Sequence, residues 1–287
     1  FGIDKIRGIL TDLREGMEIN TALAKHTVPL ESLESQFKAY AIERANALAP
    51  KLDWAKPDPD LLLPSGAAEL ASWERKHPDN YWLLRLRAQR LMQEQKWAEA
   101  KVPLQRLVEL YPQQKGSDTP YRPLVAAFRA LSDTAGEFAV LRQWTEVDDE
   151  APDAYLRVME LAAAAKDWPV VARNAERYLA VNPLVPPPYR FLAQAATETG
   201  DLSTAIVASR TLIQMDVPDR ADVHYQLARL LQRRGDLVEA RRHAVMALEE
   251  TPRYRAALGL LLDLSRQPSS TEAAPAPVPP PPAKKAE

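Results

Sequence analysis

The stretch Gly235-Asp236-Leu237-Val238-Glu239-Ala240 decides how this chain folds, because it recurs thirty-five residues earlier as Gly200-Asp201-Leu202-Ser203-Thr204-Ala205. Glycine has no Cβ and adopts the left-handed conformation that closes a helix without steric cost. The aspartate that follows can cap the next helix through its first free N–H groups, and Asp236 with Glu239 also fits a reciprocal capping box. The alanine lets two helices approach to about 8–10 Å. The stretch therefore predicts the turn of a helical hairpin.

Three weaker copies of this turn precede the two strong ones: Lys96-Trp97-Ala98-Glu99-Ala100, Gly136-Glu137-Phe138-Ala139-Val140-Leu141 and Asp167-Trp168-Pro169-Val170-Val171. The aromatic or leucine residue after each turn stands at position 97, 138, 168, 202 or 237, which gives spacings of 41, 30, 34 and 35 residues. A two-helix unit that recurs near every 34 residues is typical of a helical repeat array.

The composition limits the classes of function. The 287 residues include 37 lysines and arginines against 39 aspartates and glutamates, so the formal net charge of −2 gives no reason to expect nucleic acid as a partner. The sequence has no cysteine, which excludes disulfides and thiolate-bound metals. No apolar run approaches the roughly 20 residues that cross a bilayer, so we expect no membrane span.

Four segments follow one another along the chain. We expect a helical N-terminal segment at 1–49, a proline-rich linker at 50–64, a repeat array with a capping helix at 65–266, and a disordered tail at 267–287. Four prolines between 50 and 64 forbid a continuous helix there. The tail contains seven prolines among alanines and lysines, and it cannot bury enough apolar surface to offset the entropy of ordering.

The array resembles the tetratricopeptide repeat (TPR) family. The last copy follows the family pattern of large, small and proline positions with Leu227, Ala228, Leu231, Ala240, Ala247 and Pro252. The second copy departs most, because Arg129 follows Phe128 where a small residue is expected and Leu141 replaces the alanine. The resemblance implies an all-α fold, a TPR-like right-handed superhelix of antiparallel helix pairs (an α-α superhelix), with N-terminal helices before it and a disordered C-terminal tail after it.

The first segment carries a different resemblance. Phe1–Ile6, Leu10–Gly16, Ala22-Leu23 and Leu33–Phe37 are similar to the final helices of bacterial peptidase-MA-like zinc metallopeptidase domains. That family's zinc motif, His-Glu-x-x-His, does not occur in this sequence. The resemblance therefore implies an active site upstream of Phe1 in a longer, exported bacterial protein. The alternative interpretation is that these helices form an N-terminal cap on the array.

The sequence offers little for catalysis. Histidine occurs only at positions 26, 77, 224 and 243, and Glu239 with His243 falls short of the three or four ligands that zinc needs. No glycine-rich phosphate loop follows a strand, and no Ser/His/Asp set stands in a recognisable context. We therefore expect no catalytic residue, no metal and no cofactor in this segment.

Binding is the remaining class of function. The TPR resemblance implies that the first helix of each pair lines a concave groove, and its outward positions are Trp82, Arg85, Gln89, Gln93, Leu156, Glu160, Arg190, Gln194, Tyr225, Arg229 and Arg233. Arginines, amides and aromatics suit an extended peptide with acidic groups, although the same residues are also ordinary solvated helix residues. We predict a non-catalytic scaffold that binds a protein or an extended peptide. The alternatives are the C-terminal substrate-positioning or assembly region of a zinc metallopeptidase, and a self-association module.

Overall fold

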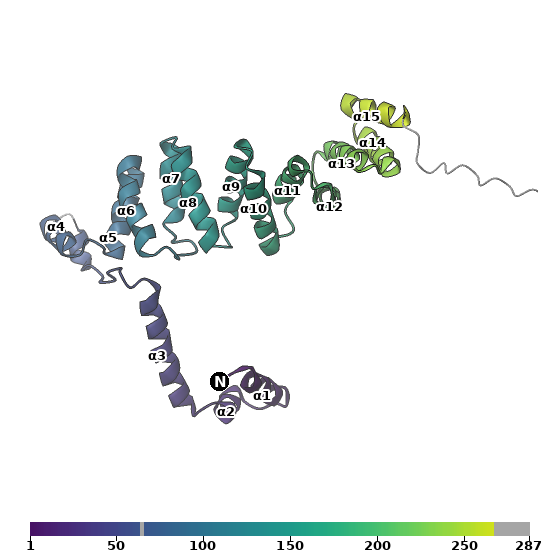
Figure 1. Ribbon diagram of the computed structural model, residues 1–287. Coiled ribbons are helices and arrows are strands. Elements are labelled where there is room, and N and C mark those ends of the chain that lie inside the picture. The colour runs from purple at the N-terminus through teal and green to yellow at the C-terminus, as the bar shows by residue number, and fades with distance from the viewer. Residues whose placement is uncertain (64–65, 267–287) are drawn as a thin grey trace, which may run out of the picture. The chain divides into compact units, whose positions relative to one another are not determined.

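The computed structural model describes residues 1–63 and 66–266, and every regular element in that part of the chain is a helix (Figure 1). The elements in chain order are α1 (Ile3–Arg14), α2 (Ile19–His26), α3 (Leu30–Leu48), the 3₁₀ helix η1 (Pro59–Leu62), α4 (Ala67–Lys76), α5 (Tyr81–Gln93), α6 (Trp97–Leu110), α7 (Tyr121–Ala130), α8 (Thr134–Val147), α9 (Pro152–Ala164), α10 (Trp168–Val181), α11 (Pro186–Thr199), α12 (Leu202–Gln214), α13 (Arg220–Arg234), α14 (Leu237–Glu250) and α15 (Arg255–Arg266). The all-α class is confirmed, and the predicted tail lies outside the described residues.

The chain divides into two compact units, Phe1–Val140 and Leu141–Glu287, with the boundary inside α8. Five helix pairs run from α5/α6 to α13/α14, and short turns join the two helices of each pair. In every pair, one residue with positive φ stands two positions before the second helix, and these residues are Gln95 (57°), Ser132 (55°), Lys166 (59°), Gly200 (82°) and Gly235 (92°). The predicted left-handed role of the two glycines is confirmed.

The predicted register of the second pair is wrong. Its turn is Ser132-Asp133-Thr134, four residues before the copy predicted at Gly136, and Gly136 lies inside α8. With this correction the turns are spaced by 37, 34, 34 and 35 residues, so the irregular spacings of 41 and 30 disappear. The corrected register also moves two assignments, because Val125 takes the place of Ala228 and Glu137 takes the place of Ala240.

Glycine is required at position 136 because the ring of Phe128 lies close to the backbone there, and not because the chain turns. A Cβ built on this residue would lie 2.3 Å from Cε1 of Phe128 and 2.9 Å from a carboxylate oxygen of Asp133. The ring of Phe128 on α7 therefore packs directly against the backbone of α8. A large side chain on one helix is accommodated by the missing side chain on the other.

The turns differ in how they cap the second helix. The carboxylate of Asp201 accepts a hydrogen bond from the backbone N–H of Thr204 at 3.1 Å, as predicted. Asp236 makes no such cap and no capping box, because its carboxylate accepts instead from the guanidinium of Arg234. The predicted capping box at Asp236 and Glu239 is therefore wrong.

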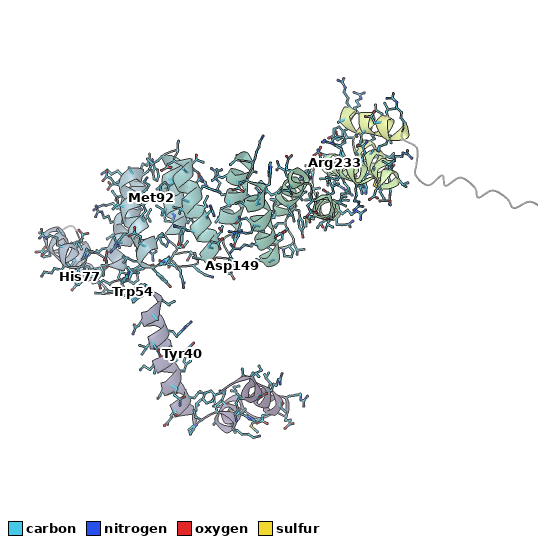
Figure 2. The ribbon with its side chains drawn as sticks, in the orientation of Figure 1. Tyr40, Trp54, His77, Met92, Asp149 and Arg233 are labelled. Atoms are coloured by element: carbon cyan, nitrogen blue, oxygen red, sulfur yellow. The ribbon has the colours of Figure 1, made fainter. Side chains whose placement is uncertain are left out.

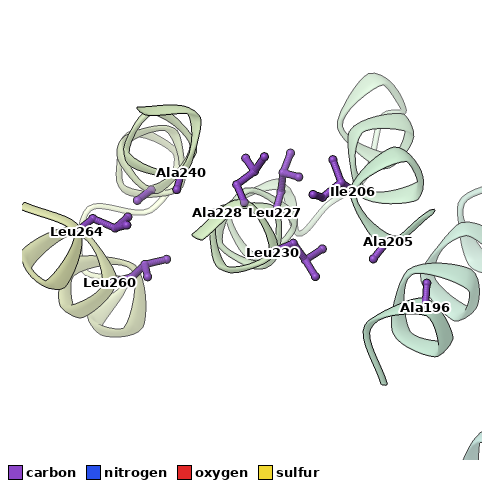
Figure 3. Close-up of a cluster of buried hydrophobic side chains, with 11 residues drawn as sticks. Ala196, Ala205, Ile206, Leu227, Ala228, Leu230, Ala240, Leu260 and Leu264 are labelled. Atoms are coloured by element: carbon purple, nitrogen blue, oxygen red, sulfur yellow. The ribbon is translucent and has the colours of Figure 1, made fainter. Parts of the chain in front are cut away.

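Alanines and leucines together make up most of the core cluster that joins α11 to α15. Figure 3 shows alanines and leucines from α11, α12, α13, α14 and α15 in one cluster, in which Ala205, Ala240 and Leu227 are completely buried. Alanine at these places allows the helix backbones to approach closely, and the leucines fill the remaining space. Leu260 and Leu264 of α15 close the same cluster, so the last pair is covered on its outer side.

In the first unit, the segment that precedes α4 and α5 packs against the array. Ala49 and Leu52 are buried with Tyr81, Leu107 and Leu110. Asp53 and Asn80 form an isolated parallel bridge, in which the N–H of Tyr81 donates to the carbonyl of Asp53 at 2.9 Å. The non-helical segment around Asp53 is thus held against the N-terminus of α5 by backbone hydrogen bonds.

Candidate binding groove

A cavity of about 660 Å³ opens between α11, α12 and α13 in the second unit. Its floor comes from α12 and from the buried sides of α11 and α13, and its rim is polar. The lining residues are Arg190, Ala193, Gln194, Thr197, Glu198, Ser209, Leu212, Asp222, Val223, Gln226, Arg229, Leu230 and Arg233. Because α11 and α13 are the first helices of successive pairs, their polar side chains face the same space.

Arg190 is held in a fixed position at one end of this groove. Its guanidinium donates two hydrogen bonds to the carboxylate of Asp219, with Nη1 at 2.8 Å from Oδ2. The hydrogen bonds from Arg190 keep the pKa of Asp219 below its usual value. Asp219 belongs to the turn that leads into α13, so this bidentate pair ties α11 to the start of α13.

Arg229 and Arg233 stand one turn apart on α13, and both are exposed. Neither makes an ion pair within residues 1–63 and 66–266, although the guanidinium of Arg229 lies 5.8 Å from the ring centroid of Tyr225. Figure 2 labels Arg233 at this place. The two guanidinium groups therefore keep hydrogen-bond donors available on the rim of the groove.

The acidic residues of the groove are arranged differently. Asp222 accepts a hydrogen bond from the hydroxyl of Tyr254 at 2.6 Å, which occupies one of its oxygens. Glu198 lines the groove from the end of α11. The groove thus has two available guanidinium groups on α13, those of Arg229 and Arg233. Of its two carboxylates, that of Asp222 already accepts a hydrogen bond within the fold.

Four of the predicted residues meet in this groove: Arg190, Gln194, Arg229 and Arg233. Tyr225 comes from the same helix but packs against Tyr254, with ring centroids 5.1 Å apart, and does not line the cavity. On α9, Glu160 forms an ion pair with Arg157 at 2.9 Å, and neither Glu160 nor Leu156 lines the cavity. The cavity is therefore lined by only a part of the predicted set of residues.

The predicted residues of the first unit belong to other surfaces. Arg85 and Gln89 line a small cavity of about 140 Å³, while Gln89 and Gln93 line a separate cavity of about 370 Å³ that also includes residues of α4. Trp82 packs edge-on against Tyr81, with centroids 5.1 Å apart. The structure does not bring these four side chains together in one site.

The loop before α7 fills much of the space beside Arg85. Asp118 of this loop accepts a hydrogen bond from Arg85 at 3.0 Å, and the amide of Gln114 donates to Tyr81 at 2.7 Å and to the carbonyl of Asp118 at 3.0 Å. The arginine that was predicted to face a partner, Arg85, thus already forms an ion pair with Asp118 of the same chain. Arg85 is therefore a weaker candidate than Arg229 or Arg233.

Several groove residues were missed by the prediction from sequence. Thr197, Glu198, Asp222 and Gln226 lie on the faces of α11 and α13 that border the predicted positions. A wider helical stripe on each first helix would have included them. Nothing in the sequence indicated that Ser209 and Leu212 of α12 would line the cavity, because they belong to the second helix of their pair.

Metal-binding groups and membrane-spanning helices were both sought among the described residues. No group of three or more histidine, aspartate or glutamate side chains in residues 1–63 and 66–266 is arranged to hold a metal ion. In the same part of the chain, no helix has the length and apolar character needed to cross a bilayer.

Comparison with solved structures finds other repeat proteins at low sequence identity. YrrB, a TPR protein with an unusual peptide-binding site, is 13% identical, with a TM-score of 0.49 over 66% of this chain and 95% of that one. MamA is 14% identical, with a TM-score of 0.46 over 60% of this chain and 92% of that one. TTC0263, a thermophilic TPR protein in Thermus thermophilus, is 17% identical, with a TM-score of 0.35 over 63% of this chain and 95% of that one.

The array is TPR-like. Its own geometry carries this statement, since the two-helix units follow one another with turn residues 34 to 37 positions apart. No family model matches the chain, and no curated protein matches it. The resemblance of residues 1–49 to the end of a metallopeptidase domain therefore stays a prediction.

Proposed function

We propose that this chain is a non-catalytic scaffold that binds an extended, acidic segment of a partner protein in the groove between α11, α12 and α13. The observation that carries the proposal is the pair Arg229 and Arg233, whose guanidinium groups line a cavity of about 660 Å³ without an ion-pair partner in the described residues. Carboxylates are the groups that such planar, multiply donating cations bind best.

The form of the groove favours an extended ligand. Its polar rim is made by two helices, with amides of Gln194 and Gln226 beside the arginines. Amides can donate to and accept from a peptide backbone, while the apolar floor at Leu212 and Leu230 can receive a side chain. A peptide chain offers all three kinds of group at once.

The Arg190–Asp219 pair plays a different part in this proposal. Because both guanidinium nitrogens of the pair are already engaged with Asp219, Arg190 sets the separation of α11 and α13 rather than reading the ligand. Reversing the charge of Arg190 would therefore disturb the fold of the turn before α13 as well as binding. Arg229 and Arg233 are the cleaner positions for a test.

The test is selection from a displayed library of random peptides by the whole chain. The wild-type chain should enrich peptides with Asp or Glu at a fixed position, and the Arg229→Glu/Arg233→Glu variant should enrich Lys or Arg there. Affinity of the wild-type peptides for the variant should fall by about tenfold or more, which corresponds to about 1.4 kcal/mol.

Arg253→Glu supplies the matched control. Arg253 is exposed in the turn before α15, outside the groove, so its charge reversal should leave the selected peptides unchanged. If the wild type enriches no peptide family, or if the double variant selects the same peptides as the wild type, the proposed groove is wrong.

A further inference from the structure

Helix α3 (Leu30–Leu48) is the longest helix in the described part of the chain, and it is poorly packed. It runs for 19 residues, yet none of its residues is buried. The stability of a helix in a protein comes mostly from the packing of an apolar face, and an isolated helix of this length is marginal in water. A surface that covers α3 would therefore stabilise it.

The apolar face of α3 is continuous, and none of its residues is buried. Leu30, Leu33, Phe37, Ala41 and Leu48 follow one another at helical spacing along one stripe. Phe37 is 67% exposed and Leu48 is 54% exposed, which is unusual for large apolar side chains. Tyr40, labelled in Figure 2, borders the same stripe and is 57% exposed.

Several residues of the stripe form pairs at equal distances before and after position 39. Leu30 and Leu48 lie nine positions on either side of this residue, and both are leucine. Phe37 and Ala41 lie two positions on either side and combine a large residue with a small one. In an antiparallel pair of identical helices, residues at equal distances from the centre face each other, so leucine meets leucine and the ring of Phe37 meets Ala41.

Two charged residues on this face obey the same symmetry. Glu34 and Arg44 lie five positions before and after Ala39. Glu34 is four residues after Leu30 and three before Phe37, and Arg44 is four residues before Leu48, so both belong to the stripe. Neither side chain forms an ion pair anywhere in the described ranges. In the antiparallel pair, Glu34 of each helix faces Arg44 of the other.

We propose that α3 forms an antiparallel, two-fold interface with α3 of a second copy of this chain, with the two-fold axis at the level of residue 39, whose own side chain lies on the opposite face of the helix. A two-fold interface repeats each contact, so it contains two Glu34–Arg44 ion pairs and two Leu30–Leu48 contacts. The contact runs the length of the helix, about 28 Å at 1.5 Å per residue. Complementary charge selects a second copy, because an unrelated partner has no reason to match a pattern that is symmetric about the centre of α3.

The test is the molar mass of the whole chain in solution, measured by sedimentation across a range of concentrations. The wild type should form a dimer. Glu34→Arg places arginines opposite each other, and Arg44→Glu places glutamates opposite each other, so each variant should weaken the dimer by about tenfold or more. The exchanged variant Glu34→Arg/Arg44→Glu restores both ion pairs and should restore the dimer.

Glu43→Arg is the matched control. Glu43 lies on the same helix but off the stripe, so reversing its charge should leave the dissociation constant of the dimer unchanged. Circular dichroism checks that every variant keeps the helical content of the wild type. A monomeric wild type overturns the proposal, and so does a folded exchanged variant that stays as weak as the single variants.

Discussion

The carboxylate of Glu137 lies 2.9 Å from Nη2 of Arg129, at the place where the other helix pairs bury Ala100, Val171, Ala205 or Ala240. Glu137 is 2% exposed, so its charge is removed from water, while the side chain of Arg129 is half exposed. A buried carboxylate is costly unless a cation compensates it. The second pair thus uses an ion pair where its neighbours use a small apolar residue.

Replacing Arg129 by alanine should therefore destabilise the chain by about 1–3 kcal/mol, because the buried carboxylate of Glu137 loses its ion pair with Arg129. Glu137→Ala in that background should recover part of the loss, since alanine is the residue that the other pairs tolerate at this place. Urea unfolding of the wild type, both single variants and the double variant measures the coupling between the two residues. Additive effects of the two substitutions would contradict a functional ion pair.

Gly136 and Gly259 provide a matched pair of glycines inside helices. A Cβ at position 136 would lie 2.3 Å from the ring of Phe128, whereas a Cβ at position 259 meets no atom within 4 Å. Gly259→Ala should therefore raise the free energy of unfolding by up to about 1 kcal/mol through helix propensity alone. Gly136→Ala should lower it, because the ring must move. Thermal unfolding of both variants checks the signs.

The smaller side chain in Phe128→Leu should relieve the clash in Gly136→Ala. If the double variant Phe128→Leu/Gly136→Ala loses less stability than the sum of the two single losses, the close approach is the cause. A destabilising effect of Gly136→Ala that Phe128→Leu does not change would place the cause in α8 itself.

The helix pairs could be predicted from sequence, and so could the register of every pair except the second, α7/α8. Glycine marks a left-handed turn residue reliably only where glycine stands there, as at 200 and 235. In the other three turns, Gln95, Ser132 and Lys166 adopt positive φ, although non-glycine residues do so rarely. The turn of the second pair was predicted at Gly136 because glycine is typical of such turns. The actual reason for this glycine, its close packing against Phe128, is a tertiary contact that the sequence does not show.

Helical spacing shows which side chains of α11 and α13 share a face, and four of the predicted residues, Arg190, Gln194, Arg229 and Arg233, line one cavity. That this cavity binds a partner stays a prediction. The spacing cannot show which arginine already has an internal partner. Asp219 and Asp118 lie in turns, and only the folded chain brings them to Arg190 and Arg85. Loop contacts therefore decide which predicted residues remain available.

The two aspartates of the strong turns should differ in their effect on stability. Asp201 accepts from the N–H of Thr204, whereas Asp236 makes no cap to α14. Asp201→Ala should therefore lower the melting temperature more than Asp236→Ala does. Equal effects of the two substitutions would contradict the difference in capping.

The Asp201 cap should also depend on pH. Hydrogen bonds from Ser203 and Thr204 lower the pKa of Asp201 to about 2. A lowered pKa in the folded state means that the contribution is complete above the unfolded pKa of about 3.9 and is lost as the pH falls toward the folded value. The difference in melting temperature between Asp201→Ala and the wild type should shrink across that range.

The buried histidine pair should make the last helix pair sensitive to mild acid. Nδ1 of His224 on α13 lies 3.0 Å from Nδ1 of His243 on α14, and burial lowers the pKa of both rings. The unfolded chain therefore takes up protons first as the pH falls below about 6.5, so stability is complete above that value and declines below it. The melting temperature of the wild type should fall between about pH 7 and about pH 5, and His224→Phe/His243→Leu should remove part of that fall. His77→Gln, at a half-exposed histidine on the other unit, should leave most of the fall in place. An undiminished fall in the double variant would assign the acid sensitivity to carboxylates instead.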